Sequence, residues 1–323
     1  MDEFELIDRY FTQDAAEADV LLGIGDDGAI VHPAAGRELV IVTDTLVEGV
    51  HFPSAMSPAD IGYRAVVVNV SDIAAMAGRP RWMTLALTLT DANAQWLQEF
   101  SGGLFEAARE YSLALIGGDT TRGKEIVVTV QVIGDVAADA VLRRSGATEG
   151  DDIYVTGTAG DAAAGLALLS SGNRQNESER YLCRRFTRPA ARIQFASKLA
   201  PLASAAIDLS DGLFGDIGKL LAASRAGGQI DVECLPLSQQ LIAVRGSDDA
   251  IELALGGGDD YEIAFTAAAS QAGAIRELAD QCSLRVTRIG EVCPGSGLRC
   301  RKNNRAFEFS TAGYLHFSGT DNG

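Results

Sequence analysis

The sequence predicts a two-domain protein in which both domains are α/β. The chain has 323 residues, a length typical of about two domains, and its 47% apolar residues are enough to fill ordinary cores. Runs of β-branched residues alternate with segments that are apolar at helical spacing. The alternation closes near residue 136 and then starts again, so we expect one domain over residues 1–136 and another over residues 137–323.

The first half should begin with a helix, because Phe4, Leu6, Ile7, Tyr10 and Phe11 recur at helical spacing. Apolar runs then predict strands, and amphipathic segments between them predict two helices, of which the first has a proline near its start. We expect the strands within residues 38–52, 82–89, 113–121 and 125–136, and the helices within residues 58–78 and 92–112.

The second half repeats this mixture. The stretch "RSGATEGDDIYVTGTAGDAAAGLALL" predicts a strand, a glycine-rich turn and a helix, and "SSGNRQNESER" predicts a surface excursion. Strands mixed with helices are expected again within residues 205–224, 229–237, 254–266 and 283–292.

The charge balance excludes some classes of partner. Lys and Arg number 27 against 44 Asp and Glu, which gives a net charge of -17. Nucleic acids and anionic membranes both require clustered Lys and Arg, so we expect neither as a partner. An anionic small molecule would need a metal ion between itself and this chain.

The cysteines and the N-terminal residues indicate the cytoplasm. The five cysteines form no CxxC pair and are odd in number, which suits a reducing compartment. The start, "MDEFELIDRYF", is acidic and amphipathic, unlike a signal peptide. We find no apolar stretch long enough to span a bilayer.

Residues 23–28, Gly-Ile-Gly-Asp-Asp-Gly, match the GxGxxG spacing of a dinucleotide-binding loop. Such a loop cradles phosphate at a helix N-terminus, and two carboxylates there would repel a pyrophosphate by about 4 kcal/mol per close pair. Pro33 and Gly36 also lie where the following helix should run, and a strand comes next, so we expect a hairpin. Either the match is accidental or a cation lies between the loop and its ligand.

Aspartates recur where apolar runs end, beside Gly, Ser or Thr. Strand ends are where α/β folds place ligands. For any one residue an N-cap or a turn is the simpler explanation, and Asp72 and Asp211 could cap the helices after them. Six separate acidic turns, however, exceed what capping demands. The set comprises Asp26, Asp27, Asp44, Asp72, Asp119, Asp208, Asp211, Asp259 and Asp260.

Oxygen donors of this kind suit a hard cation such as Mg²⁺, which uses few protein carboxylates and completes its shell with water and phosphate oxygens. Structural zinc is disfavoured, because His32, His51 and His316 have no partners at ligand spacing. The sequence contains no EF-hand loop, no GxSxG elbow and no P-loop. A bound phosphate would therefore not be held by a Walker loop.

With these residues considered, the chain resembles the thiamine-monophosphate kinase family, whose wider superfamily includes aminoimidazole ribonucleotide synthetase and selenophosphate synthetase. The matching segments follow the family's order over nearly the whole chain. They are "LGIGDDGA", "TDTLVEGVHF", "NVSDIAAMAG", "LIGGDTTRG", "RRSGATEGDDIYVTGTAGDAAAGL", "AAIDLSDGL", "GGGDDYEIAFT" and "GYLHF". The second, fourth and sixth together are specific to this kinase rather than to its relatives.

The resemblance implies ATP-dependent phosphorylation of thiamine monophosphate to thiamine diphosphate, by direct in-line transfer assisted by several Mg²⁺ ions. It also implies a homodimer whose N-terminal α/β domains pair across a β-rich, barrel-like interface, each followed by a larger α+β domain. The acceptor is a phosphate oxygen that is already largely ionised at pH 7, so no catalytic proton acceptor is expected.

The family's functional residues transfer motif by motif. Metal binding is implied for Asp27, Thr43, Asp44, Asp72, Asp119, Asp208 and Asp211, with Asp26 shaping the turn beside Asp27. ATP contacts are implied for Tyr111, Gly118, Asp119, Arg144 and Ser210, and substrate contacts for His51, Asp259 and Tyr314.

Several alternatives stay open on the sequence alone. His51 and Tyr314 could simply be packing residues, and periodicity does not distinguish Arg144 from Arg143. The family usually has Glu where this chain has Asp259, so that contact would be longer or bridged by water. At the level of function, the rivals are a superfamily relative that acts as an ATP-dependent synthetase, and a metal-binding scaffold without activity.

Overall fold

The computed structural model describes residues 3–12, 19–172 and 175–308. The chain divides into two compact units, Met1–Val141 and Leu142–Gly323, and each is described by itself. Both combine a sheet with helices, as the sequence predicts. No helix in the described ranges has the length and apolar character needed to cross a membrane.

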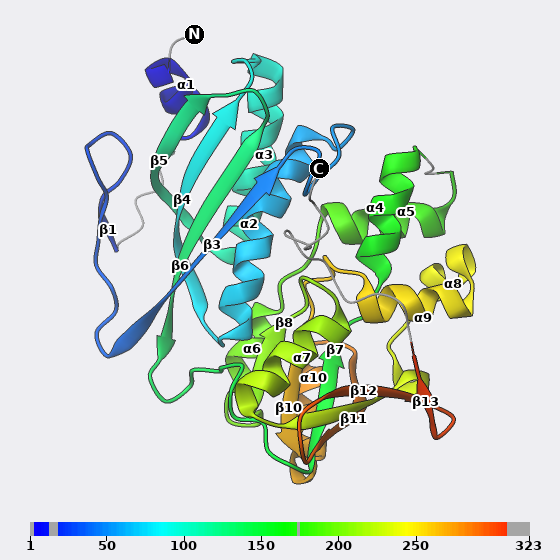
Figure 1. Cartoon of the computed structure of the whole chain (residues 1–323). Helices are drawn as coiled ribbons and strands as arrows, with labels where there is room; N and C mark the ends of the chain where they lie inside the picture. The colour runs from blue at the N-terminus through cyan, green and yellow to red at the C-terminus, as the bar shows by residue number, and fades with distance from the viewer. Residues whose placement is uncertain (1–2, 13–18, 173–174, 309–323) are drawn as a thin grey trace, which may run out of the picture. The chain divides into compact units, whose positions relative to one another are not determined.

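The first unit is built on an open four-stranded sheet with two long helices packed on one face (Figure 1). The strand order is β3-β6-β4-β5; β4 and β5 run parallel, and β6 is antiparallel to both β3 and β4. The elements of this sheet layer are β3 (Arg37–Val47), α2 (Pro58–Ala75), β4 (Arg79–Leu89), α3 (Ala94–Tyr111), β5 (Ala114–Arg122) and β6 (Val127–Ala137). The strands and the two helices predicted for residues 38–136 are confirmed.

Local chemistry fixes where the two helices begin. Ser57 caps α2 by accepting the Asp60 N–H at 3.2 Å, and Pro58 occupies the first turn, where its missing N–H costs nothing. Asn93 caps α3 by accepting two backbone N–H groups at 3.0 Å each. The two helices then pack against each other through glycines. A Cβ on Gly103 would lie 1.8 Å from the Ala59 carbonyl oxygen, and one on Gly62 would lie 2.2 Å from that of Phe100.

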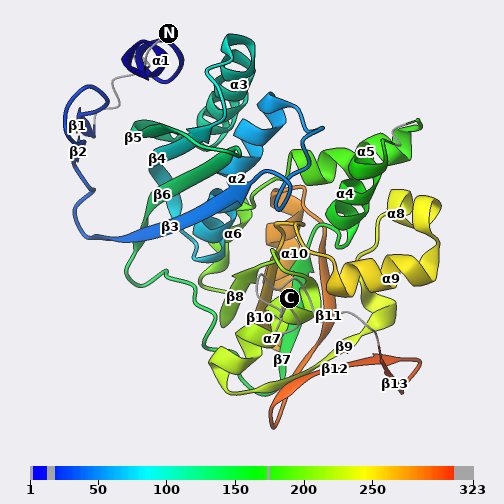
Figure 2. The same cartoon turned by 45° about the horizontal axis from the view of Figure 1, so that its top comes forward.

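The loop at residues 23–29 is the tip of a short hairpin. The predicted N-terminal helix, α1 (Glu3–Tyr10), precedes it, and β1 (Val20–Leu22) pairs antiparallel with β2 (Ile30–Val31) on either side of the loop. Figure 2 shows this hairpin beyond the β5 edge of the sheet. No helix follows the glycines directly, because β2 and then β3 come next, so the dinucleotide-loop interpretation is excluded. The hairpin was expected after the glycines, around Pro33 and Gly36; instead β2 pairs with β1, and the glycine loop is the tip of the hairpin.

The second unit is built on a seven-stranded sheet of order β13-β12-β9-β11-β7-β10-β8, antiparallel except where β12 lies parallel to β9. Its strands are β7 (Asp151–Thr156), β8 (Ala205–Asp208), β9 (Gly227–Asp231), β10 (Ile263–Ala268), β11 (Val286–Cys293), β12 (Gly297–Lys302) and β13 (Arg305–Phe307). Its α-helices are α4 (Asp161–Ser171), α5 (Glu177–Thr187), α6 (Ile193–Leu199), α7 (Leu213–Ser224), α8 (Gln239–Arg245), α9 (Ser247–Gly256) and α10 (Ala272–Gln281). Two short 3-10 turns, η1 (Val232–Cys234) and η2 (Ala269–Gln271), complete it.

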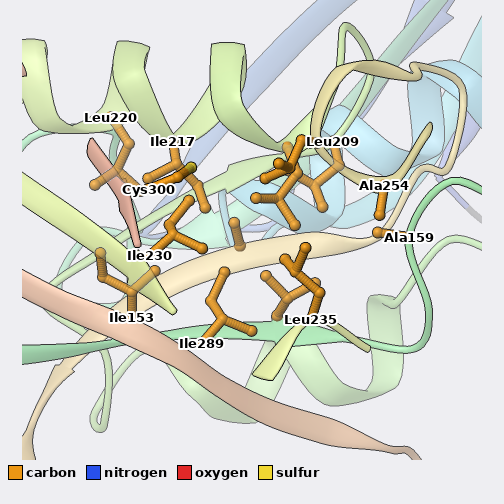
Figure 3. Packing of buried hydrophobic residues seen from close by; sticks show 14 of the residues in the cluster. Ile153, Ala159, Leu209, Ile217, Leu220, Ile230, Leu235, Ala254, Ile289 and Cys300 are labelled. Carbon is orange, nitrogen blue, oxygen red and sulfur yellow. The ribbon is translucent and has the colours of Figure 1, made fainter. Parts of the chain in front are cut away.

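The core of the second unit lies between this sheet and α7 (Figure 3). Ile217 and Leu220 of α7 share a buried cluster with strand residues such as Ile153, Ile230 and Ile289. Leu209 and Leu213, each 1% exposed, belong to the same cluster and flank residues 210–212. The short turn between β8 and α7 is therefore anchored in the core at both ends. All five cysteines lie in the described chain as free thiols.

The α2–α3 contact gives a direct test of the first unit's packing. We expect Gly103→Ala to lower the free energy of unfolding by about 1–3 kcal/mol, because its methyl group would overlap the Ala59 carbonyl. The neighbouring Gly102 has open space around it, so Gly102→Ala should be neutral or stabilise the helix by up to about 1 kcal/mol. Urea unfolding of both variants measures the difference; an equal effect would contradict the packing described.

Candidate functional site

The first unit contains a cavity of about 490 Å³ between α1, the hairpin loop and the β4–β5 edge of the sheet. It brings together Asp27, Gly118 and Asp119, which the sequence placed in the site but which are far apart along the chain. The walls are formed by Ile7, Phe11, residues 23–29, Leu85 and residues 115–120. One part of the wall is apolar and the other consists of glycines and carboxylates.

The polar part of this cavity carries negative charge without a compensating cation. Asp26, Asp27 and Asp119 line it, and no Lys, Arg or His is among the described residues that do so. The Asp26 side chain accepts the Asp27 N–H at 2.8 Å, so Asp26 shapes the turn as expected. This leaves the exposed Asp27 carboxylate available, and such oxygen donors fit a hard divalent cation.

Gly118 and Asp119 lie inside a strand, not at its end. The expectation of a strand ending at this glycine-acid pair is wrong, because β5 stays paired with β4 as far as Arg122. Gly118 has a structural reason to be glycine, since a Cβ there would lie 1.9 Å from the Leu85 carbonyl oxygen. Asp119 is exposed, and its side chain projects from the face of the sheet opposite to that of Thr120.

Thr43 and Asp44 also lie inside a strand, at the opposite edge of the sheet. Their strand, β3, is separated from β5 by β6 and β4, which amounts to three spacings of about 4.8 Å, or roughly 14 Å. Thr43 accepts a hydrogen bond from the Gln131 amide at 3.3 Å, and Asp44 alternates to the helix-covered face. Within one copy of the sheet, Thr43 and Asp119 therefore do not share an ion.

Asp72 lies in the last turn of α2, which is continuous through it. The alternative that Asp72 caps a following helix is therefore wrong. A carboxylate near a helix C-terminus meets the negative end of the helix dipole. The position thus costs helix stability, and helix formation does not account for an acid here.

Tyr111 and His51 do not line the cavity, although both lie in the first unit. Tyr111 is the last residue of α3, and its neighbour Tyr63 has a pKa raised by burial and then by Tyr111 and Glu110. The Nδ1 atom of His51 accepts the Val47 N–H at 3.0 Å. Nδ1 of this imidazole is therefore engaged by the backbone.

The second unit brings together two loops that carry predicted site residues. The segment after β8 and the segment before β10 are joined by three backbone hydrogen bonds, of 2.8 to 2.9 Å. They run from Leu209 N–H to the Glu262 oxygen, from Tyr261 N–H to the Leu209 oxygen, and from Asp259 N–H to the Ser210 oxygen. These two adjacent backbone segments carry Asp208, Ser210, Asp211 and Asp259. Among these four, Asp208 alone occupies the expected strand end, as the last residue of β8.

Asp216 holds the first of these loops, and the sequence interpretation missed it. Its Oδ2 accepts the backbone N–H groups of Ser210, Asp211 and Gly212 at 2.9 to 3.2 Å. Burial raises the pKa of Asp216, against the opposing effect of Lys219, whose Nζ lies 2.8 Å from it and also pairs with Asp211. The α7 N-cap is Gly212, so Asp211 does not cap that helix. The sequence signal that could have identified Asp216 is an acidic residue in the first turn of the helix that follows "SDG".

Two buried carboxylates, those of Asp260 and Glu262, hold the second loop, which precedes β10. Asp260, 2% exposed, accepts the Gly160 and Ala162 N–H groups at 2.6 and 3.1 Å, at the start of α4. Burial raises the pKa of Asp260 to about 8. Asp259 itself accepts the Tyr261 hydroxyl at 3.2 Å and is only partly buried. The sequence flagged Asp260 only as one acidic residue among many, and Glu262 not at all.

The arginine pair lies on a loop fixed by Ser224. The Ser224 hydroxyl donates to the Arg144 carbonyl at 3.1 Å and accepts the Gly146 and Ala147 N–H groups at 3.2 and 3.1 Å. Arg143 and Arg144 are both exposed, so burial does not single out either one. Tyr314 lies outside the described residues.

The structure shows no group of three or more His, Cys, Asp or Glu side chains gathered around a metal position in the ranges it describes. The implied ligands Asp27, Thr43, Asp44, Asp72 and Asp119 lie in the first unit, and Asp208 and Asp211 lie in the second. Sparse carboxylates of this kind still suit Mg²⁺, because that ion keeps several waters and shares phosphate oxygens.

Comparison with known families gives the class of protein. The model of the AIR synthase related protein N-terminal domain matches residues 25–136, and that of the C-terminal domain matches residues 148–303. The two units therefore correspond to the N- and C-terminal domains of an AIR synthase related protein.

Individual relatives narrow the class to a family. The chain is 44% identical to the thiamine-monophosphate kinase of Salmonella typhimurium, over 98% of both chains. It is 43% identical to a crystal structure of thiamine-monophosphate kinase from Stenotrophomonas maltophilia K279a, with a TM-score of 0.88 over 95% of this chain and 98% of that one. A structure of AaThiL complexed with AMPPCP and TMP is 34% identical, with a TM-score of 0.78 over 91% and 92%. The chain belongs to the thiamine-monophosphate kinase family of enzymes, which confirms the resemblance inferred from its motifs.

The role of Asp216 can be tested by stability. Asp216→Ala leaves three backbone N–H groups without their acceptor and should lower the free energy of unfolding by about 2–4 kcal/mol. Asp216→Asn keeps one acceptor oxygen and should lose clearly less. Urea unfolding measures both, with Asp280→Ala at an exposed position of α10 as the control. Equal losses in the two Asp216 variants would show that the hydrogen bonds are not what matters.

Proposed function

We propose that this protein transfers the γ-phosphoryl group of ATP to thiamine monophosphate, giving thiamine diphosphate and ADP, by direct in-line transfer assisted by several Mg²⁺ ions in thiamine diphosphate biosynthesis. Family membership supports the reaction, and AaThiL complexed with AMPPCP and TMP supports the pair of ligands. The observation that carries the metal requirement is the cavity lined by three carboxylates and, in the described chain, by no basic side chain.

We assign the residues as the family motifs suggest. The first domain, residues 1–136, would bind nucleotide and metal and form the dimer, and residues 137–323 would form the α+β domain. The metal ligands would be Asp27, Thr43, Asp44, Asp72, Asp119, Asp208 and Asp211. ATP would contact Tyr111, Gly118, Asp119, Arg144 and Ser210, and thiamine monophosphate would contact His51, Asp259 and Tyr314.

The chain's contribution to the reaction is alignment and charge neutralisation. Bound Mg²⁺ supplies positive charge between two anionic reactants. The Arg144 guanidinium can bind the polyphosphate through two parallel hydrogen bonds, on a loop already fixed by Ser224. No residue needs to remove a proton, because the attacking oxygen of a phosphate monoester is largely ionised at pH 7.

Two observations support the homodimer as part of this proposal. On the face of the first sheet away from its helices, Leu39 and Ile41 of β3 are 45% and 60% exposed. Thr43 and Asp119 lie at opposite edges of that same sheet. Pairing with the sheet of a second copy would cover the apolar residues and close a barrel-like interface, and it would bring the β3 edge of one copy toward the β5 edge of the other. We place the dimer in the cytoplasm, without a nucleic-acid or membrane partner.

Activity with one carboxylate removed tests the proposal. The wild type with ATP, Mg²⁺ and thiamine monophosphate should form one ADP per thiamine diphosphate, and chelation with EDTA should abolish turnover. Asp27→Asn and Asp119→Asn should each lower kcat/KM by about 10²-fold or more. Asp26→Asn is the matched comparison, because an amide oxygen can still accept the N–H at position 27, and it should lose much less.

Chromatographic separation of the thiamine phosphates, with a coupled ADP assay, measures these rates. No product from the wild type at saturating Mg²⁺ would eliminate the kinase. Metal binding by the wild type without turnover would favour the scaffold alternative instead.

The dimer is tested separately by sedimentation velocity. The wild type should sediment as a dimer, and Ile41→Asp should shift it toward a monomer, because a charge would be buried in the apolar interface. Ile242→Asp changes an isoleucine of similar character, 39% exposed on α8, and should leave the dimer intact. A wild-type monomer, or a dimer unaffected by Ile41→Asp, would contradict the interface.

A further inference from the structure

Beneath the loop that carries Asp259 lies a buried ion cluster that the mechanism above does not use. It consists of Glu262, Arg185 and Arg192, and we propose that it is a positioning device: it fixes the backbone of residues 257–262 so that Asp259 meets thiamine monophosphate in one geometry. This inference rests on the proposed function, because it takes Asp259 as a substrate contact.

Glu262 is the centre of the cluster and has every acceptor direction in use. Its side chain has no exposed surface. Thr156 Oγ1 donates to Oε2 at 2.7 Å, Arg185 Nη2 donates to Oε1 at 2.9 Å, and Arg192 donates through both Nε and Nη2. Burial alone would raise the pKa of Glu262, but the two arginines hold that pKa below its ordinary value. The carboxylate is therefore charged, and it is hydrogen-bonded to residues of β7, α5 and the start of α6.

A turn at Gly157 packs directly against the Glu262 carboxylate. Gly157 has a φ of +60°, and a Cβ on it would lie 2.1 Å from Glu262 Oε1. Thr156, just before this turn, also accepts the Ile263 N–H at 2.9 Å, so it holds both the side chain of Glu262 and the backbone after it. The loop is thus fixed to β7 by its side chain and its main chain together.

The loop above the cluster is strained and depends on such support. Asp259 and Tyr261 have φ values of +71° and +52°, a region that costs free energy for residues other than glycine. Between them, Asp260 accepts two N–H groups at the start of α4. The backbone of Glu262 in turn accepts the Leu209 N–H at 2.8 Å, which continues the contact to the loop with Ser210 and Asp211.

A stabilising role alone would not require charges here. A buried ion pair contributes little net stability compared with apolar residues of similar volume, because desolvation offsets the attraction. Hydrogen bonds from two guanidinium groups, however, fix the direction of a carboxylate in a way that apolar packing does not. The cluster therefore fits a role in geometry, and its loss should appear first as weaker recognition of the substrate that the loop faces.

The test separates KM for thiamine monophosphate from kcat and from KM for ATP. Glu262→Gln keeps size but loses charge, and we expect it to raise KM for thiamine monophosphate roughly tenfold or more, with kcat and KM for ATP changed by less than about threefold. Amide hydrogen exchange over residues 257–262 should become faster. Arg192→Lys keeps the charge without the two-pronged geometry and should give a smaller rise of KM.

The matched control is Arg288→Gln, which removes another arginine-carboxylate pair of the same sheet, with Asp152, away from this loop. It should leave all three kinetic constants and the loop exchange unchanged. If Glu262→Gln does not fold, Arg192→Lys and Thr156→Val carry the same comparison. The proposal is overturned if folded cluster variants leave KM and loop exchange at wild-type values, or change them no more than Arg288→Gln. A wild type that forms no thiamine diphosphate would instead overturn the proposed function, while the exchange measurement would still test the positioning.

Discussion

A polyphosphate can occupy a cavity of aspartates only if a cation neutralises the repulsion between them. In the first unit, Asp26, Asp27 and Asp119 line one wall without a basic residue beside them in the described chain. The whole chain carries a net charge of -17, so its overall charge also repels a polyphosphate. The glycines of the hairpin loop and of β5 let the backbone come close, and the carboxylates determine what can bind there. The cavity of the first unit thus offers oxygen donors of the kind that bind a metal ion, and no arginine is among its described lining residues.

In the second unit, buried charged residues hold the loops that carry the predicted site residues. The loop after β8 and the loop before β10 are joined by backbone hydrogen bonds, and each is held by a buried carboxylate. Asp216 collects three N–H groups of one loop, and Glu262 anchors the other to a pair of arginines. Leu209 and Leu213 secure the first loop in the apolar core (Figure 3). Buried charged groups thus fix the backbone of the two loops that carry Ser210, Asp211 and Asp259.

Much of this architecture was predictable from local sequence. Periodicity gave α2, α3 and the strands around them, and Pro33 with Gly36 was enough to reject a dinucleotide loop. The exact setting of the aspartates was not predictable. Asp119 follows two glycines, a pattern typical of a turn, yet pairing with β4 keeps its segment in a strand, because tertiary context overrides such local preferences. Asp72 looked like a cap but lies within a helix. Glu262 escaped notice because its partners are distant in sequence: Thr156 is 106 residues away and Arg192 is 70.

The central claim is that a cation mediates the contact between the carboxylates of the first unit and a polyphosphate. Isothermal titration of the full-length protein with a non-hydrolysable ATP analogue, with Mg²⁺ and then with EDTA, tests it most directly. The account predicts clear binding with Mg²⁺ and at least about a hundredfold weaker binding without it, since the uncompensated repulsion of even one close carboxylate pair is worth a few kcal/mol. Equal affinity in the two titrations would contradict the claim, because the nucleotide would then be held by contacts that need no metal.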